Sequence, residues 1–311
     1  MNKSLALHAS VLALLVVLFF ILPAYHHGQV ARIMVLAVYA MGYNILFGYA
    51  GLLSLGHALF FAAGMYGMGL AAQHGGASLI PAFLAGLAAT LVVAVIAGAL
   101  ALRTTGVAFM IVTLMFAQTG YLTVLYFGEY TRGDEGFVLV ASAREIMGVA
   151  LSGADARYIA ALFVFTLALL AKLWLVHSPA GHVLIAIREN EARAEMLGYN
   201  TYAYKFLALV LSAVFAGAAG ATYGILFGYV GASFAEVPYS IFPLLWVLLG
   251  GAGTVLGPVA GTAFMLYLID YTSGLTDAYM LIVGVALVAL VLFARKGLLG
   301  LVRQKFAPWL P

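Results

Sequence analysis

The chain carries no formal charge between Arg32 and Arg103, and this stretch limits its fold more than any other feature. A charged side chain at the centre of a spanning helix costs about 2.5–3.5 kcal/mol on insertion scales, so spans are kept free of charges. One span needs about 20 residues, and the uncharged stretch is long enough for several. In the whole chain, charged residues make up 8% and hydrophobic residues 65%. Soluble domains have about 25% charged residues, so we exclude a soluble enzyme or a disordered or fibrous protein and predict an all-α polytopic membrane protein.

Turn-forming clusters divide this chain into about 8–10 expected transmembrane helices within a single domain, residues 1–311. In the uncharged stretch, the clusters at 48–54 and 73–78 separate three spans. In chain order, the expected spans are 5–22, 30–48, 54–72, 79–101, 104–127, 158–177, 205–229, one or two crossings within 239–270, and 278–294. We interpret the first as a retained helix, since its apolar run exceeds the 7–15 residues usual in a signal peptide and no A-x-A site follows.

The distribution of lysine and arginine predicts the orientation. With the first residues inside and each break changing sides, ten cations lie inside and four outside. Cytoplasmic loops of membrane proteins carry this excess, so we expect a multi-pass inner-membrane protein with both termini in the cytoplasm. Residues 128–156 then form an outer loop and residues 178–204 a cytoplasmic segment.

Several kinds of chemistry are missing. No glycine is followed by lysine, so there is no P-loop and no route to ATP hydrolysis of that kind. The chain has no cysteine, and the His26-His27 pair alone does not make a metal site. No basic run is long enough to bind nucleic acid. The spans also contain almost none of the acids and histidines that bind coupling ions, since Asp270 and Glu129 lie near span ends and the groups in mid-span are mild ones such as Asn44 and Gln118. We therefore expect no enzyme activity, metal or cofactor in this chain, and an energy source outside it.

Residues 178–204 predict a short helix between two spans. Pro179 breaks the preceding helix, Asn190 can cap a new one, and Gly198 suits its left-handed end. Such a helix can dock into a cleft on a soluble motor protein. An ordinary connector at the membrane surface would have the same pattern, and spacing alone leaves both interpretations open.

Two glycine-rich breaks and one glycine-lined helix face predict how the spans pack. Broken helices often flank substrate paths, although both breaks also suit tight turns at the membrane face. His57, beside the first break, favours a hydrogen-bonded structural role over a gate. Small residues four apart allow close helix contact. That face consists of Ala216, Gly220, Gly224 and Gly228.

Four motifs together resemble the permeases of branched-chain amino acid ABC importers, the LivM-type subunit. Residues 186–200, A-I-R-E-N-E-A-R-A-E-M-L-G-Y-N, resemble the loop by which such permeases couple to their ATPases. The other three are GYNILFGYAGLLSLGHALFFAAG (42–64), LRTTGVAFMIVTLMFAQ (102–118) and LLGGAGTVLGPVAG (248–261). One departure is visible: in TRGDEGF (131–137), Arg132 stands where the family usually has glycine.

The resemblance implies a subunit that imports branched-chain or other hydrophobic amino acids with ATP hydrolysed elsewhere. Its implied partners are a LivH-type second permease, two ATPase subunits that hold Mg-ATP, an external binding protein and the lipid bilayer. Similar permeases carry urea, short amides or aromatic acids, and this alternative stays open. The implied ATPase-coupling residues are Arg188, Glu189, Glu191, Ala192, Glu195 and Gly198. The expected broken helices and translocation path comprise Gly48, Gly51, Ser54, Gly56, His57, Gln118, Gly250, Gly251, Gly253, Gly257 and Pro258.

Overall fold

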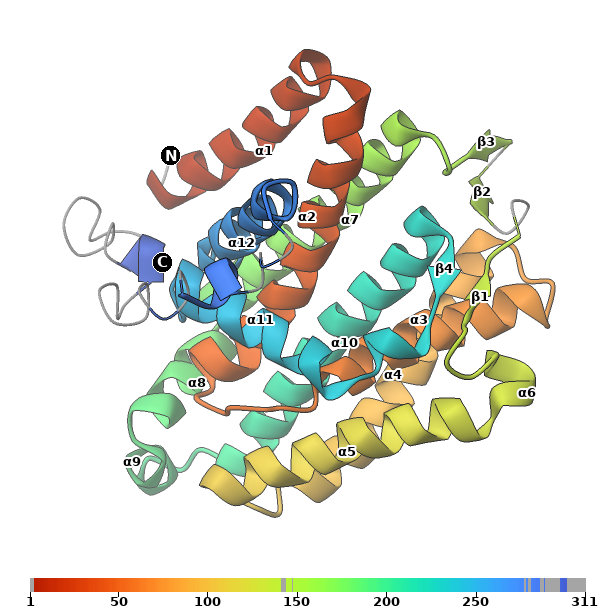
Figure 1. The fold of residues 1–311 in the computed structure, drawn as a ribbon. Coiled ribbons are helices and arrows are strands. Elements are labelled where there is room, and N and C mark those ends of the chain that lie inside the picture. Colours follow the sequence, from red (N-terminus) through yellow and green to blue (C-terminus); the bar gives the residue numbers. More distant parts are fainter. Residues whose placement is uncertain are drawn as a thin grey trace.

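The computed structural model describes residues 3–140, 144–146, 148–276, 278, 281–285, 288 and 297–300. Its longer helices (Figure 1) are α1 (Lys3–Ile21), α2 (Ala24–Asn44), α3 (His57–Gln73), α4 (Leu79–Ala101), α5 (Gly106–Tyr126), α7 (Ala154–His177), α8 (Pro179–Glu189), α10 (Thr201–Phe227), α11 (Val237–Gly250) and α12 (Gly257–Ser273). The short elements are the π-helix η1 (Ile45–Tyr49), α6 (Gly128–Thr131), α9 (Glu191–Met196), the 3₁₀-helix η3 (Ala232–Phe234), and the strands β1 (Phe137–Val138), β2 (Glu145–Ile146), β3 (Val149–Ala150) and β4 (Tyr229–Val230). The predicted span at 278–294 lies mostly outside the described residues.

The uncharged stretch folds into three helices, as the sequence predicts. Pro23, whose φ is −67°, directly precedes α2 and is suited to a helix start because its ring fixes that angle. After η1, Gly51 takes a φ of +74°, which a residue with a side chain rarely adopts. The backbone stays irregular up to Gly56, so α3 begins at His57 rather than at residue 54 as expected.

The central helices are enclosed by others that expose apolar side chains. Five helices in the described part are long and apolar enough to cross a membrane. The buried share of the apolar span is highest for α2 with η1, at 89%, and lowest for α5, at 17%. On α5, the exposed Val107, Ile111 and Met115 follow one another at one-turn spacing. An apolar stripe turned outward is typical of a helix that faces lipid.

Glycines bring α3 and α10 into backbone contact. A Cβ on Gly220 would lie 2.0 Å from the carbonyl oxygen of Phe61, and one on Gly64 would lie 2.1 Å from that of Gly217. Gly220 therefore belongs to a close-packed helix interface, as the four-residue spacing predicts. Gly228 does not, because it follows the last residue of α10 with a φ of +73° and ends the helix.

Helices α2 and α10 are adjacent and antiparallel. The Ser212 hydroxyl, near the middle of α10, donates to the carbonyl of Gly42 near the end of α2. At the other end, the Arg32 guanidinium lies 5.3 Å from the Phe227 ring. We call the end that holds η1 and α9 the α9 end, and the opposite end, where β1 pairs with β4, the β1 end (Figure 1).

The segment between α5 and α7 is mostly irregular. It holds α6, β1 and the short β2–β3 hairpin. Arg132 has a φ of +62° directly after α6. Glycine adopts this conformation without strain, whereas a residue with a side chain rarely does.

Candidate functional site

The structure brings the two glycine-rich breaks together at the α9 end. The Asn44 side chain joins them: its Nδ2 donates to the Thr254 carbonyl at 2.8 Å, and its Oδ1 accepts from the Gly253 N–H at 3.0 Å. A Cβ on Gly48 would lie 2.6 Å from the Gly253 nitrogen. Glycine is thus required where the two segments touch, and the breaks form one junction, which we call the inner junction (Gly48–Gly51 and Gly250–Gly257).

Two basic side chains bind this junction through its backbone carbonyls. Arg188, on α8, donates from Nη1 to the Gly48 carbonyl. Lys172, on α7, is fully buried, and its Nζ lies 3.1 Å from the Val255 carbonyl oxygen. Broken helices leave carbonyls without their usual partners, and these side chains supply the missing donors. Arg188, although exposed, therefore connects residues 178–204, which we call the coupling segment, to the inner junction.

His57 has a fixed place beside the same junction. Its Nε2 lies 2.7 Å from the Ser212 Oγ, and that hydroxyl already donates its one hydrogen to the Gly42 carbonyl. His57 Nε2 must therefore donate, and Nδ1, which is buried without a hydrogen-bond partner, carries the lone pair. The ring links α3 to α10 and α2.

The space beside the first break is small. A cavity of about 10 Å³ lies between Ser54, Gly56 and Thr113, and this volume holds about one water molecule. Gln118 lies further along α5 and is half-buried. In this conformation an amino acid cannot enter at this point. Gly257 and Pro258 start α12 on the far side of the inner junction.

Capping residues shape the coupling segment into two short helices. The Ser178 hydroxyl caps α8, which begins with Pro179, and the Asn190 side chain accepts from the Arg193 N–H at 2.9 Å to cap α9. Gly198 ends α9 with a φ of +88°, and the Tyr199 N–H then bonds to the Ala194 carbonyl. This is the glycine-dependent helix end expected at residue 198.

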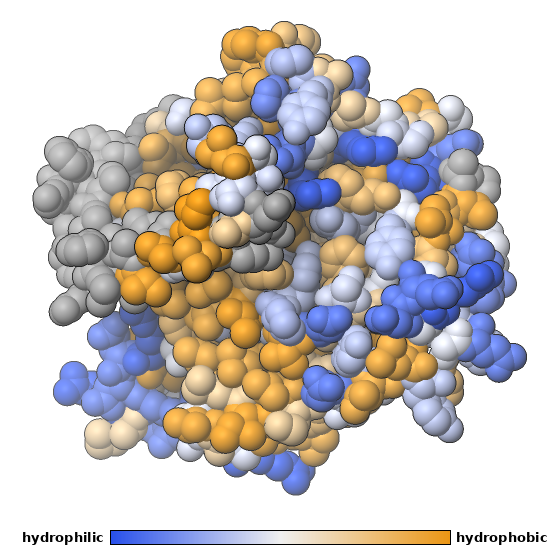
Figure 2. Space-filling view, in the orientation of Figure 1, coloured by the Kyte–Doolittle hydropathy of each residue, from blue (hydrophilic) through white to orange (hydrophobic). Residues whose placement is uncertain are grey.

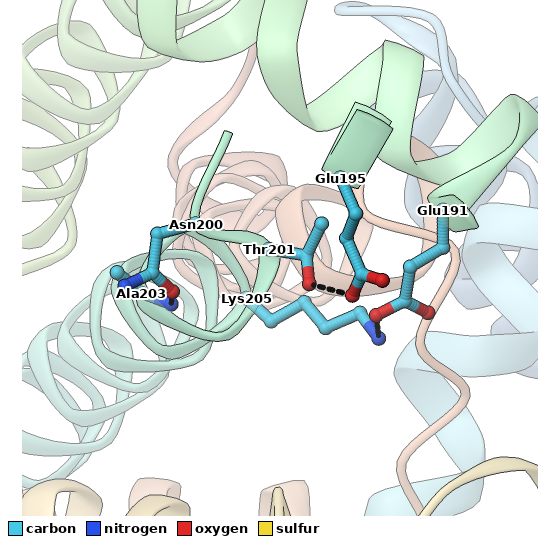
Figure 3. Close-up of polar contacts among 6 residues, drawn as sticks. All are labelled: Glu191, Glu195, Asn200, Thr201, Ala203 and Lys205. Atoms are coloured by element: carbon cyan, nitrogen blue, oxygen red, sulfur yellow. Dashed lines mark hydrogen bonds and ion pairs between the residues drawn. The ribbon is translucent and has the colours of Figure 1, made fainter. Parts of the chain in front are cut away.

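The acids of α9 point toward α10 and not away from the protein (Figure 3). Glu191 forms an ion pair with Lys205, and the Thr201 hydroxyl donates to Glu195 at 2.8 Å. Lys205 is buried, so this pair is less exposed to screening than an ordinary surface pair. Two side-chain contacts therefore connect α9 to the first two turns of α10.

The outer side of the coupling segment is partly apolar. Met196 and Leu197 are 80% and 70% exposed, and Ala192 and Glu189 are exposed beside them. In Figure 2 hydrophilic residues gather near α8 and α9 and near β1 and α6, with a broad apolar area between them. Met196 and Leu197 are thus two neighbouring apolar side chains on a largely polar part of the surface.

Replacing Asn44 with leucine is expected to destabilise the inner junction. Leucine has the same branched shape and the same number of heavy atoms, but it is larger and leaves the Gly253 N–H and the Thr254 carbonyl without their partner. Each unsatisfied buried group costs about 1–3 kcal/mol, so we expect a clear drop in the thermal unfolding midpoint of the purified chain in detergent. Gln118→Leu is the control, and an equal drop in both variants would contradict the role of Asn44.

Sequence reasoning missed the roles of Asn44 and Lys172. Asn44 was noted only as a mild polar group, and Lys172 only as one of the cations that set the orientation. Their partners lie more than 80 residues away in the chain, so no local pattern could have identified them.

Comparison with known proteins gives a consistent match. The model of a family described as "Branched-chain amino acid transport system / permease component" matches residues 28–293. The high-affinity branched-chain amino acid transport system permease proteins LivM of Salmonella typhimurium and Escherichia coli are both 27% identical over 295 residues, 88% of this chain and 69% of theirs. A probable LivM permease of Methanocaldococcus jannaschii is 30% identical over 115 residues, 36% of this chain and 33% of its own. No solved structure matches.

Proposed function

This chain belongs to the branched-chain amino acid transport permease family, and we propose that it is one membrane-spanning half of an ABC importer for branched-chain or other hydrophobic amino acids. A second permease chain forms the other half. ATP is hydrolysed by separate subunits at the α9 end, which is then cytoplasmic, and an external binding protein delivers the cargo to the β1 end.

The observation that carries this proposal is the attachment of the coupling segment. Glu191 and Glu195 join α9 to α10, and Arg188 joins α8 to the inner junction. A displacement of α8 and α9 is therefore passed to α10 and to the inner junction. A plain connector helix has no need of charged contacts to both.

The exposed side chains of α9 supply the contact with the motor. Met196 and Leu197 offer apolar surface to a cleft, while the acids beside them are occupied within the chain. ATP-driven closure of the motor would move this tip. In this conformation the cavity beside the first break admits about one water, so we place the passage for cargo between the two permease chains.

Reconstitution in lipid vesicles tests the proposal. The chain is assembled with its second permease and ATPase subunits, and uptake of radiolabelled leucine is measured with ATP inside and binding protein outside. We expect uptake only when both are present. Uphill uptake by this chain alone would contradict the proposal, and competition by urea but not by leucine would contradict the proposed cargo.

A further inference from the structure

The chain contains the same nine-residue motif twice. Residues 43–51 are Y-N-I-L-F-G-Y-A-G and residues 223–231 are Y-G-I-L-F-G-Y-V-G, with seven of nine positions identical. The first copy ends α2 through η1, and the second ends α10 and continues into β4. The same motif therefore ends both α2 and α10.

The surroundings of the two copies repeat as well. Each is followed by a helix, α3 or α11, and at the end of that helix comes Gly-Gly-Ala, at 75–77 and 250–252, before α4 or α12. Because α2 and α10 are antiparallel, the two copies lie at opposite ends of the protein. Inverted repeats of this kind are common in transporters, whose two access states arise from movement of one repeat against the other.

The two copies have different backbone conformations. In the first, the helix loosens into η1, the Ala50 N–H bonds to the Ile45 carbonyl, and the positive φ falls on Gly51. In the second, α10 stays helical to Phe227 and the positive φ falls on Gly228. Nearly the same sequence is thus compatible with two ways of ending a helix.

An arginine from outside the repeat binds the first copy. Arg188 donates to the Gly48 carbonyl, and a Cβ on Gly51 would lie 3.0 Å from its Cγ. The arginine thus lies directly on the last part of this copy, at the α9 end.

A second arginine binds the second copy. Arg144, just before β2, donates from Nε to the Ile225 carbonyl at 2.6 Å and from Nη2 to the Leu226 carbonyl at 2.7 Å. A Cβ on Gly228 would lie 2.4 Å from its Nη1. Burial and, next, the nearby Arg157 cation lower the pKa of Arg144 below its usual value. Two hydrogen bonds to backbone carbonyls at the negative end of a helix favour the charged guanidinium there.

We propose that Arg188 and Arg144 are matched positioning residues, each holding one copy of the repeated motif closed, at the α9 end and the β1 end of the passage. The inference rests on the proposed transport function. It also explains where the arginines are: Arg188 lies beside the segment that contacts the motor, and Arg144 lies in the loop that faces the binding protein. Movement of either partner can thus release the end that it touches.

Labelling of single cysteines tests this directly, because the chain has no cysteine of its own. Ala50→Cys and Val230→Cys occupy equivalent positions of the two copies, and both residues are buried. Each is combined with Arg188→Ala or Arg144→Ala in the assembled transporter. The reaction with a membrane-impermeant thiol reagent is measured on sealed vesicles of both orientations.

The expected result is selective. Arg188→Ala should raise the labelling rate at position 50 by about tenfold or more, and leave position 230 unchanged, because a hydrogen bond from a charged donor is lost at one end only. Arg144→Ala should do the reverse, with reagent on the other side of the membrane. No change at either position, or an equal rise at both, would overturn the proposal.

Controls separate this effect from general damage. Arg193→Ala and Arg132→Ala remove exposed arginines from the same two regions and should not change labelling. Arg188→Lys and Arg144→Lys keep the charge with a smaller donor group and should give intermediate labelling rates. They replace the alanine variants in the test if the alanine variants do not fold. Labelling does not require transport. If labelling is selective but the transporter that keeps both arginines takes up no leucine, the proposed cargo is wrong and the role of the two arginines stands.

Discussion

Replacing Gly220 with valine is expected to prevent the central helices from packing, so that little folded protein is recovered. A Cβ at this position would lie 2.0 Å from the carbonyl oxygen of Phe61 on α3. Overpacking of a core costs about 1–3 kcal/mol when side chains can move. Here the obstacle is backbone, so we expect a loss of more than about 3 kcal/mol. The measurement is the monodisperse fraction on size exclusion and the thermal midpoint in detergent.

Gly28→Val is the matched control for this variant. Gly28 lies in α2, and a Cβ there would have no heavy atom within 4 Å. The same change of residue should therefore have little effect. A Gly220 variant as stable as the Gly28 variant would show that α3 and α10 do not approach as closely as described.

Much of the helical architecture could be predicted from the sequence because the breaks between helices are local. Glycine, through a positive φ, fixes where α9 and α10 end. The largest error was the start of α2, expected at residue 30 and observed at Ala24, and the start of α3 was expected at residue 54 and observed at His57. No charge marks that boundary, and only the irregular backbone after Gly51 sets it.

The contacts of the candidate site could not be predicted in the same way. The sequence placed Arg188, Glu191 and Glu195 in a coupling segment, but their directions depend on tertiary contacts: Arg188 reaches Gly48, which is 140 residues away. The nine-residue repeat was the one signal in the sequence that could have linked the two ends of the protein.

Replacing Glu191 with arginine is expected to uncouple uptake from ATP hydrolysis. Glu191 is the ion-pair partner of the buried Lys205, and the substitution puts two like charges in contact at the point where α9 meets α10. Breaking a buried pair typically costs about 3–5 kcal/mol. Glu191 is only partly buried, so we expect a smaller cost, enough to detach α9 from α10 while the chain stays folded. Leucine uptake should fall by about tenfold or more, since 1.4 kcal/mol corresponds to a factor of ten, while hydrolysis by the assembled transporter continues.

A charge exchange separates loss of the pair from loss of Glu191 itself. Glu129→Arg makes the same change of charge at an exposed residue of α6, far from α9, and should leave the coupling of uptake to hydrolysis unchanged. The double variant Glu191→Arg with Lys205→Glu restores opposite charges, and a coupling energy between two residues is what such a cycle measures. Partial return of uptake in the double variant would identify the α9–α10 ion pair as the link that carries movement. If uptake stays absent while α9 still binds the ATPase subunits, Glu191 acts through another contact and the proposed transmission to α10 is wrong.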